Sequence, residues 1–184
     1  SFLIGERANF IKVFLVVNIY IFLMFEINYK IKISFFVILI SLLVIFLKMN
    51  PTYKVRYYDQ IKTIFISDGI LNYTNNSQYG AHYNVAKEIF LNNPILGVGV
   101  KNFRIESASK RYENLDHPKN HLRIATHPHQ VHYEFLSETG IFGYFSFLLF
   151  IFFSILYSLK KYLKEKNSFQ LAGILFVLSS VLPI

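Results

Sequence analysis

Four apolar runs, each close to the length that crosses a lipid bilayer, limit this chain more than any other feature. They cover residues 10–27, 31–47, 141–159 and 169–184. A helix needs about 20 apolar residues to span the roughly 30 Å hydrocarbon core of a membrane. A content of 53% hydrophobic residues, with 20 Phe among 184 residues, also exceeds what a soluble domain usually carries. The sequence therefore predicts an all-α membrane protein with several transmembrane helices.

The lysines between these runs predict which side of the membrane each connection faces. Lys30 and Lys32 separate the first two runs, and residues 160–167, which join the last two, contain four lysines. Lysine is enriched in the short cytoplasmic loops of membrane proteins. Both short connections are therefore expected in the cytoplasm, and the long segment between the second and third runs is expected on the outer side.

Three parts follow from this topology. Residues 1–47 form two transmembrane helices, residues 48–140 a large, partly helical extracytoplasmic loop, and residues 141–184 two further transmembrane helices joined by the basic cytoplasmic loop 160–167. The sequence begins without an initiator Met and ends within an apolar run. We therefore expect these helices to belong to a larger polytopic bundle.

The outer segment carries the groups that can do chemistry. It contains all six histidines, and the chain has no cysteine, which excludes disulfides, thiolate nucleophiles and thiolate metal ligands. The formal net charge of +8 fits basic residues that flank membrane spans, and it also suits an anionic partner such as a phosphorylated lipid. No nucleic acid partner is predicted.

A helix is predicted over residues 79–91, where apolar side chains recur at helical spacing until Asn92-Asn93-Pro94 ends the pattern. The next residues contain Gly97 and Gly99, which permit a tight backbone path. Such a turn can cradle a phosphate, but no strand precedes it, so a packed turn is the better interpretation.

A histidine cluster, His127, His129 and His132, runs directly into the third apolar run. Pro128 suits the first position of a helix with Thr126 or His127 as its cap. His129 is then expected at the N-terminus of the helix that becomes the third span. The helix dipole lowers the pKa of an imidazole placed there and favours a neutral side chain that can act as a base.

Gly140 and Gly143 are expected to break or tighten this helix near the membrane boundary, although glycine is also common inside membrane helices. Two other interpretations of the cluster stay open. One is a zinc site, which would use four ligands of accepted types: His127, His129, His132 and Glu138. His127 and His129 would point apart on a helix, so no metal site is predicted. The other is a structural role, with the histidines capping the helix and anchoring aromatic residues at the interface.

Three motifs follow one another along the chain. Gly5-Glu6-Arg7-Ala8 places a small residue and an arginine ahead of the first apolar run. Residues 93–103 read N-P-x-x-G-x-G-x-x-N-F, and His127-Pro128-His129-Gln130 is followed by residues 138–143, which read E-x-G-x-x-G. In this order the motifs resemble those of the O-antigen ligase and O-antigen polymerase superfamily, bacterial membrane glycosyltransferases with a small-residue-Arg motif at the outer end of a helix, the same loop signature, and H-x-H-N before E-x-G-x-x-G.

The chain departs from the family pattern at two places. Gln130 stands where the family more often has Asn, which keeps the amide on a longer side chain. Gln78 or Tyr79 stands near a position where family members often have Arg. One phosphate contact is therefore missing from its usual place, and we expect a replacement among three arginines of the outer segment: Arg104, Arg111 and Arg123.

The resemblance implies transfer of a glycan from an undecaprenyl-diphosphate carrier to lipid A core, another glycan or a protein. It places the chain in the bacterial inner membrane with the large loop on the periplasmic side. His129 would be the base and Arg7 the diphosphate clamp, since arginine binds phosphate through two parallel hydrogen bonds and stays charged near lipid. His127 and Glu138 would orient the base or the acceptor. No cofactor is expected, and the family is similarly thought to work without a metal ion.

Other functions stay open on the sequence alone. A polymerase that joins lipid-linked repeat units shares the donor chemistry and differs from a ligase only in its acceptor. A transporter of polysaccharide is disfavoured, because its polar groups would be expected near the membrane midplane and not in an outer loop. A receptor-like or structural membrane protein would need neither Arg7 nor His129.

Overall fold

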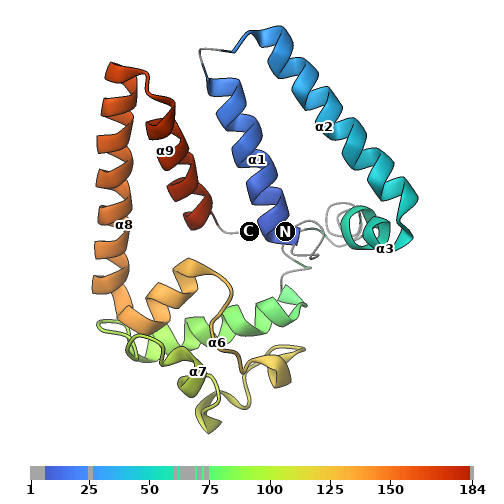
Figure 1. Ribbon diagram of the computed structural model, residues 1–184. Coiled ribbons are helices and arrows are strands. Elements are labelled where there is room, and N and C mark those ends of the chain that lie inside the picture. The colour runs from blue at the N-terminus through green and yellow to red at the C-terminus, as the bar shows by residue number, and fades with distance from the viewer. Residues whose placement is uncertain are drawn as a thin grey trace. The chain divides into compact units, whose positions relative to one another are not determined.

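A computed structural model describes residues 7–24, 27–59, 62, 69, 72 and 75–182 (Figure 1). At residues 7–11, 53, 56 and 57 this description covers the backbone only. These residues form helices and turns, and they contain no β-strand. The all-α prediction is confirmed for the part of the chain that is described. The chain divides into two compact units, one made of residues 1–67 and 153–182 and the other of residues 68–152.

The first unit consists of long apolar helices. It contains α1 (Arg7–Leu23), α2 (Tyr29–Met49), the short α3 (Pro51–Tyr53), the π-helix η1 (Lys54–Asp59), the end of α8 (Val131–Glu165), and α9 (Ser168–Val181). The side chain of Asn28 caps α2 by accepting a hydrogen bond from the Lys30 N–H, and Asn167 caps α9 in the same way. α1 and α9 pack against each other (Figure 1). Their core contains four buried residues: Tyr162, Leu171, Ile174 and Leu175.

Two of these helices are long and apolar enough to cross a membrane, namely α2 and α8. They correspond to the second and third predicted runs. α1 and α9 have 17 and 14 residues and are shorter than a full span. The structure therefore supplies two candidate spans among the described residues, and the other two predicted spans stay predictions.

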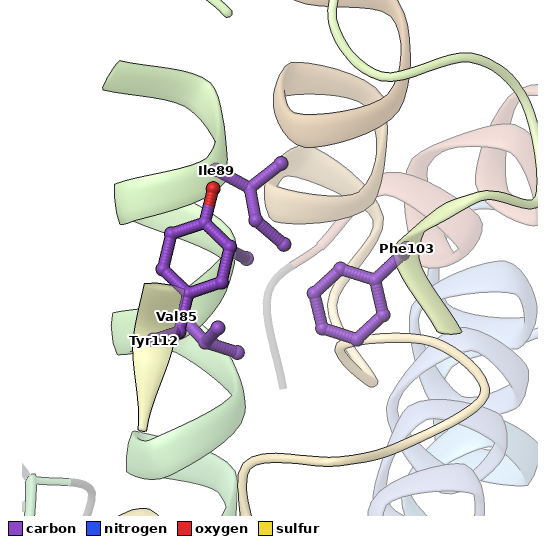
Figure 2. Close-up of a cluster of buried hydrophobic side chains, with 5 residues drawn as sticks. Val85, Ile89, Phe103 and Tyr112 are labelled. Carbon is purple, nitrogen blue, oxygen red and sulfur yellow. The ribbon is translucent and has the colours of Figure 1, made fainter. Parts of the chain in front are cut away.

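The second unit holds α6 (Gln78–Asn92), α7 (Phe103–Glu106), the 3₁₀ turns η3 (Lys110–Tyr112) and η4 (Asn120–Leu122), and the start of α8. Ser77 caps α6 by accepting a hydrogen bond from the Gly80 N–H, and the helix ends at Asn92, so the predicted helix over residues 79–91 is confirmed. The core of the unit is shown in Figure 2, where Phe103 and Tyr112 lie against α6. The α6 residues of this core are Val85, Ala86 and Ile89.

α8 bends sharply at Gly140, which has φ 63° and ψ −165°. This backbone conformation is available almost only to glycine. The Phe135 and Phe147 rings stack with centroids 4.0 Å apart across the bend, whereas 12 residues of straight helix would separate them by about 18 Å. The Tyr144 hydroxyl and the His132 Nδ1 also lie 3.0 Å apart across it. The predicted break is therefore confirmed at Gly140, and it divides α8 into a first arm, residues 131–139, and a second arm, residues 141–165.

The bend of α8 packs against the glycine loop, which we define as residues 93–102. A Cβ at Gly97 would lie 2.3 Å from the Glu138 carbonyl carbon, and a Cβ at Gly140 would lie 2.3 Å from the Ile95 oxygen. Real Cβ atoms do not approach other atoms this closely, so only glycine allows the two backbones to meet. Three backbone hydrogen bonds join them: Val98 N to Ser137 O at 3.0 Å, Gly99 N to Glu138 O at 2.8 Å, and Ile141 N to Pro94 O at 2.8 Å.

We predict that Gly97→Ala opens this contact. The left-handed backbone at residue 97 (φ 66°) alone costs an alanine about 1–2 kcal/mol, and the overlap of its methyl group with Glu138 adds to that. Hydrogen–deuterium exchange on the intact protein in lipid nanodiscs should show faster exchange at residues 97–103. Gly173→Ala is the matched control, because a Cβ at Gly173 meets no atom within 4 Å. Equal exchange in both variants would contradict the prediction.

Candidate functional site

The segment before α8 turns at His129. α8 begins at Val131, and the Gln130 side chain caps it by accepting a hydrogen bond from the Tyr133 N–H at 2.8 Å. The prediction that the helix starts at Pro128, with Thr126 or His127 as its cap, is wrong. The reason is that His129 has φ 60°, a left-handed conformation that cannot continue into a helix. Pro128 is instead fully buried.

The His129 side chain belongs to an imidazole cluster, which we define as His82, His127 and His129. The His129 ring stacks on His82 with centroids 5.4 Å apart, and the His127 ring lies 4.2 Å away. Tyr79 contacts the His129 ring edge-on at 5.5 Å. The expectation that His127 and His129 point apart is therefore wrong, because they do not lie on a helix.

Two members of this arrangement come from α6 and were not predicted as site residues. Tyr79 and His82 are three residues apart, so they share one face of the helix. Their spacing was visible in the sequence, but nothing local indicated that residues 127–129 would pack onto that face. The helical periodicity of α6 could have identified the face that carries Tyr79 and His82, but not the segment that packs against it.

A single hydrogen bond fixes the His82 ring. Its Nε2 lies 3.0 Å from the carbonyl oxygen of Leu122, so Nε2 must carry the proton and donate it. In the neutral ring Nδ1 is then an acceptor, and among the described residues this buried atom has no hydrogen-bond partner. His82 therefore presents an unfilled acceptor inside the site.

The surroundings of His129 and His82 favour their neutral forms. Burial lowers the pKa of His129, and the charges of His127 and His82 lower it further. Burial also lowers the pKa of His82, and the hydrogen bond to Leu122 offsets part of this effect. The predicted direction for His129 is confirmed, but the cause is burial and neighbouring imidazoles. His129 still keeps an exposed side, so an incoming proton donor can reach it.

Arg123 lies next in the chain to the carbonyl that holds His82. Its side chain is 9% exposed, its Nη1 donates to the Asn120 oxygen at 3.5 Å, and its Nε has no partner among the described residues. No carboxylate of the described residues forms an ion pair with it. A buried guanidinium is costly unless an anion compensates it. Arg123 is therefore suited to hold a negatively charged group.

The other predicted arginines are either exposed or outside the described side chains. Arg104 is exposed on α7, and Arg111 is exposed on η3. α1 starts at Arg7, but the Arg7 side chain and the preceding Gly5-Glu6 lie outside the described residues. The roles assigned to Arg7 and Arg104 stay predictions.

Glu138 binds the glycine loop. Its Oε2 accepts the Lys101 N–H at 2.7 Å and its Oε1 accepts the Phe103 N–H at 3.2 Å. The side chain is 5% exposed. The loop N–H groups that could have cradled a phosphate thus hold a carboxylate of the chain itself, which supports the packed-turn interpretation. An orienting role for Glu138 toward His129 stays a prediction.

The positions of these residues also show whether they could bind a metal ion. Within the described part of the chain, no group of three or more His, Asp or Glu side chains is arranged to hold one. His132, one of the four ligands considered, instead contacts Tyr144 across the bend of α8.

We predict that the His129 imidazole loses its proton below pH 6.5, the ordinary histidine value, because burial and two neighbouring imidazoles disfavour its charged form. The rate of diethyl pyrocarbonate modification, followed by mass spectrometry, reports the neutral fraction. His127→Asn should move the His129 midpoint upward, since one source of positive charge is gone. A midpoint at or above that of a histidine in a denatured reference peptide would contradict the prediction.

Comparison with known proteins supports the resemblance found in the sequence. A family model described as O-antigen ligase matches residues 2–148, which include both the glycine loop and the imidazole cluster. No curated protein matches the sequence. The family indicates a bacterial membrane enzyme of the glycosyltransferase type, with a general role in the glycan transfer that builds surface polysaccharides. Because the match covers most of its length, the chain belongs to the O-antigen ligase family.

Proposed function

We propose that this protein transfers a glycan from an undecaprenyl-diphosphate carrier to lipid A core or a similar acceptor, on the periplasmic face of the inner membrane. One observation carries the proposal: the imidazoles of His82 and His129, with lowered pKa values, occur in the second unit together with a buried guanidinium that has no carboxylate partner among the described residues. The hydrogen bond from His82 to Leu122 links them, since Leu122 precedes Arg123. A base for the acceptor hydroxyl and a cation for the departing diphosphate are the two groups that this transfer needs.

His129 acts as the base. The acceptor hydroxyl donates its proton to an imidazole nitrogen of His129 while its oxygen forms a bond to the anomeric carbon. The bond from that carbon to the diphosphate oxygen breaks, and its electron pair stays on the diphosphate. A lowered pKa supports this role, because His129 is then neutral and ready to accept a proton at neutral pH.

Arg123 stabilises the departing diphosphate. The leaving group gains negative charge as the bond breaks, and a preorganised cation lowers the energy of that state. A buried guanidinium with no carboxylate partner in the described part of the chain supports the role, since the diphosphate would supply the missing charge. Arg7 and Arg104 are further donor contacts in this proposal.

The remaining groups orient the reaction. His127 holds the acceptor beside His129. Glu138 holds the glycine loop against α8, and this contact fixes the position of the helix that follows His129. No metal ion takes part, because the arginines neutralise the leaving group. Transfer that stops in EDTA and returns with a divalent cation would overturn this part of the proposal.

We predict that His129→Gln lowers transfer by about 10²–10⁴-fold, the usual contribution of general base catalysis. The assay uses the intact protein in nanodiscs, a labelled lipid-linked glycan as donor, and either lipid A core or a second lipid-linked repeat as acceptor. Binding of the donor should survive the substitution. Turnover equal to the wild type would rule out His129 as the base.

His121→Gln is the matched control, since His121 is an exposed histidine of the same unit. It should transfer at the wild-type rate. The acceptor decides between the two enzyme functions: product on lipid A core supports a ligase, whereas product only on the lipid-linked repeat identifies a polymerase. No transfer to either acceptor by the wild type would return the question to the transport and structural alternatives.

We predict that Arg123→Lys weakens donor use by more than tenfold in kcat/KM while the fold is kept. Lysine preserves the charge but cannot form two parallel hydrogen bonds with a diphosphate. Arg111→Lys, at an exposed site of the same unit, is the control and should leave kcat/KM unchanged. If Arg111→Lys lowered kcat/KM more than Arg123→Lys did, Arg111 would be the residue that binds the diphosphate.

A further inference from the structure

The glycine loop exposes large aliphatic side chains at its turn. Ile95, Leu96 and Val100 are 58%, 73% and 70% exposed, and none of the three belongs to a helix. Lys101 and Arg104 follow and are exposed as well. A short segment with several apolar side chains followed by basic ones has the composition of a membrane-surface contact.

The position of this turn is fixed by its contact with α8. The Ile141 N–H donates to the Pro94 oxygen at 2.8 Å, and the Ile95 carbonyl lies where a Cβ of Gly140 would be. Ile95 therefore sits at the first residues of the second arm. The arm also exposes apolar side chains there, with Ile141 49% and Phe142 65% exposed.

The length of the second arm locates the membrane boundary. The apolar stretch from residue 141 to residue 159 covers about 28 Å as a helix, close to the hydrocarbon thickness of about 30 Å. Lys160 and Lys161 follow it and must reach one interface. The other interface then falls at Ile141, the residue whose N–H bonds to the glycine loop.

We propose that the turn of the glycine loop inserts into the outer leaflet of the membrane. Ile95, Leu96 and Val100 enter the boundary between headgroups and acyl chains, and Lys101 binds anionic lipid headgroups. The loop is already ordered by its backbone hydrogen bonds to Ser137 and Glu138, so insertion requires little further loss of chain freedom. The occupant of this surface is lipid, because the surface is continuous with the first turn of a candidate membrane span.

The inserted loop fixes the second unit at a defined depth. The same loop holds the Glu138 segment, which leads back through the first arm of α8 to His129. Lipid contact would thus set the height of the imidazole cluster above the membrane. This inference rests on α8 as a span and does not require the proposed catalytic roles.

Site-directed spin labelling tests it directly, because the chain contains no cysteine. We would label Leu96→Cys in the intact protein, reconstituted in vesicles of phosphatidylethanolamine and phosphatidylglycerol, and measure collisions with oxygen and with a water-soluble nickel chelate. Oxygen concentrates in lipid and the chelate in water. The oxygen-to-nickel ratio at residue 96 should be several-fold higher than at a water-exposed site of the same unit.

Two matched positions calibrate the result. Asn114→Cys lies at an exposed turn and should give the water value, whereas Phe150→Cys, 69% exposed on the second arm, should give the lipid value. All three sites are exposed, so the label does not disturb a core. A label at residue 96 that matches residue 114 would overturn the proposal, and so would a label shielded from both reagents, which would mean contact with protein. Val100→Cys gives an independent second reading with the same expected outcome.

Discussion

The architecture of the second unit depends on Glu138 and the backbone around it. Its carboxylate accepts the N–H groups of Lys101 and Phe103, and its main-chain oxygen accepts the N–H of Gly99. Hydrogen bonds to an ionised carboxylate contribute about 1.5–3 kcal/mol each. One residue thus joins the glycine loop, the start of α7 and the end of the first arm of α8. Because Phe103 is also part of the core on α6, the same contacts connect the loop to the packing that holds α6 in place.

The site built on this frame is unusual in its charge. Imidazoles of His82, His127 and His129 lie together, and Arg123 is buried with no carboxylate partner among the residues that the structure describes. Glu138 is engaged by backbone N–H groups. The carboxylate that interacts with the cluster is Glu134: burial raises its pKa, and the charge of His127 partly offsets this. Burial is the main cause of the lowered pKa of His129, and the charges of His127 and His82 lower it further. Under the proposed function, the diphosphate of the donor compensates the charge of Arg123.

Much of the local structure could be predicted from the sequence. The spacing of apolar residues and Asn92-Asn93-Pro94 predicted α6, and Gly140 predicted the break in α8. Continuous apolar runs predicted α2 and the second arm of α8, because every side of such a helix faces an apolar environment. These features depend on neighbours a few residues apart.

The contacts between distant segments could not be predicted. His82 precedes His129 by more than forty residues, and no local pattern indicated that their rings would stack. The start of α8 was misplaced because His129 takes a left-handed conformation that its residue type does not require, and because the local cap from Gln130 to Tyr133 was overlooked. The partners of Glu138 were also hidden, since backbone N–H groups leave no trace in the residue types. The family motifs indicated which residues matter but not what each of them touches.

The meeting of the glycine loop with α8 has a consequence for how this sequence can vary. At Gly97 and Gly140 the atoms that would collide with a methyl group belong to the backbone and not to a side chain. A clash with a side chain can be relieved by a smaller residue elsewhere, but no second substitution shortens a carbonyl. The two positions therefore have no compensating partners, and each admits a single residue type regardless of the rest of the chain.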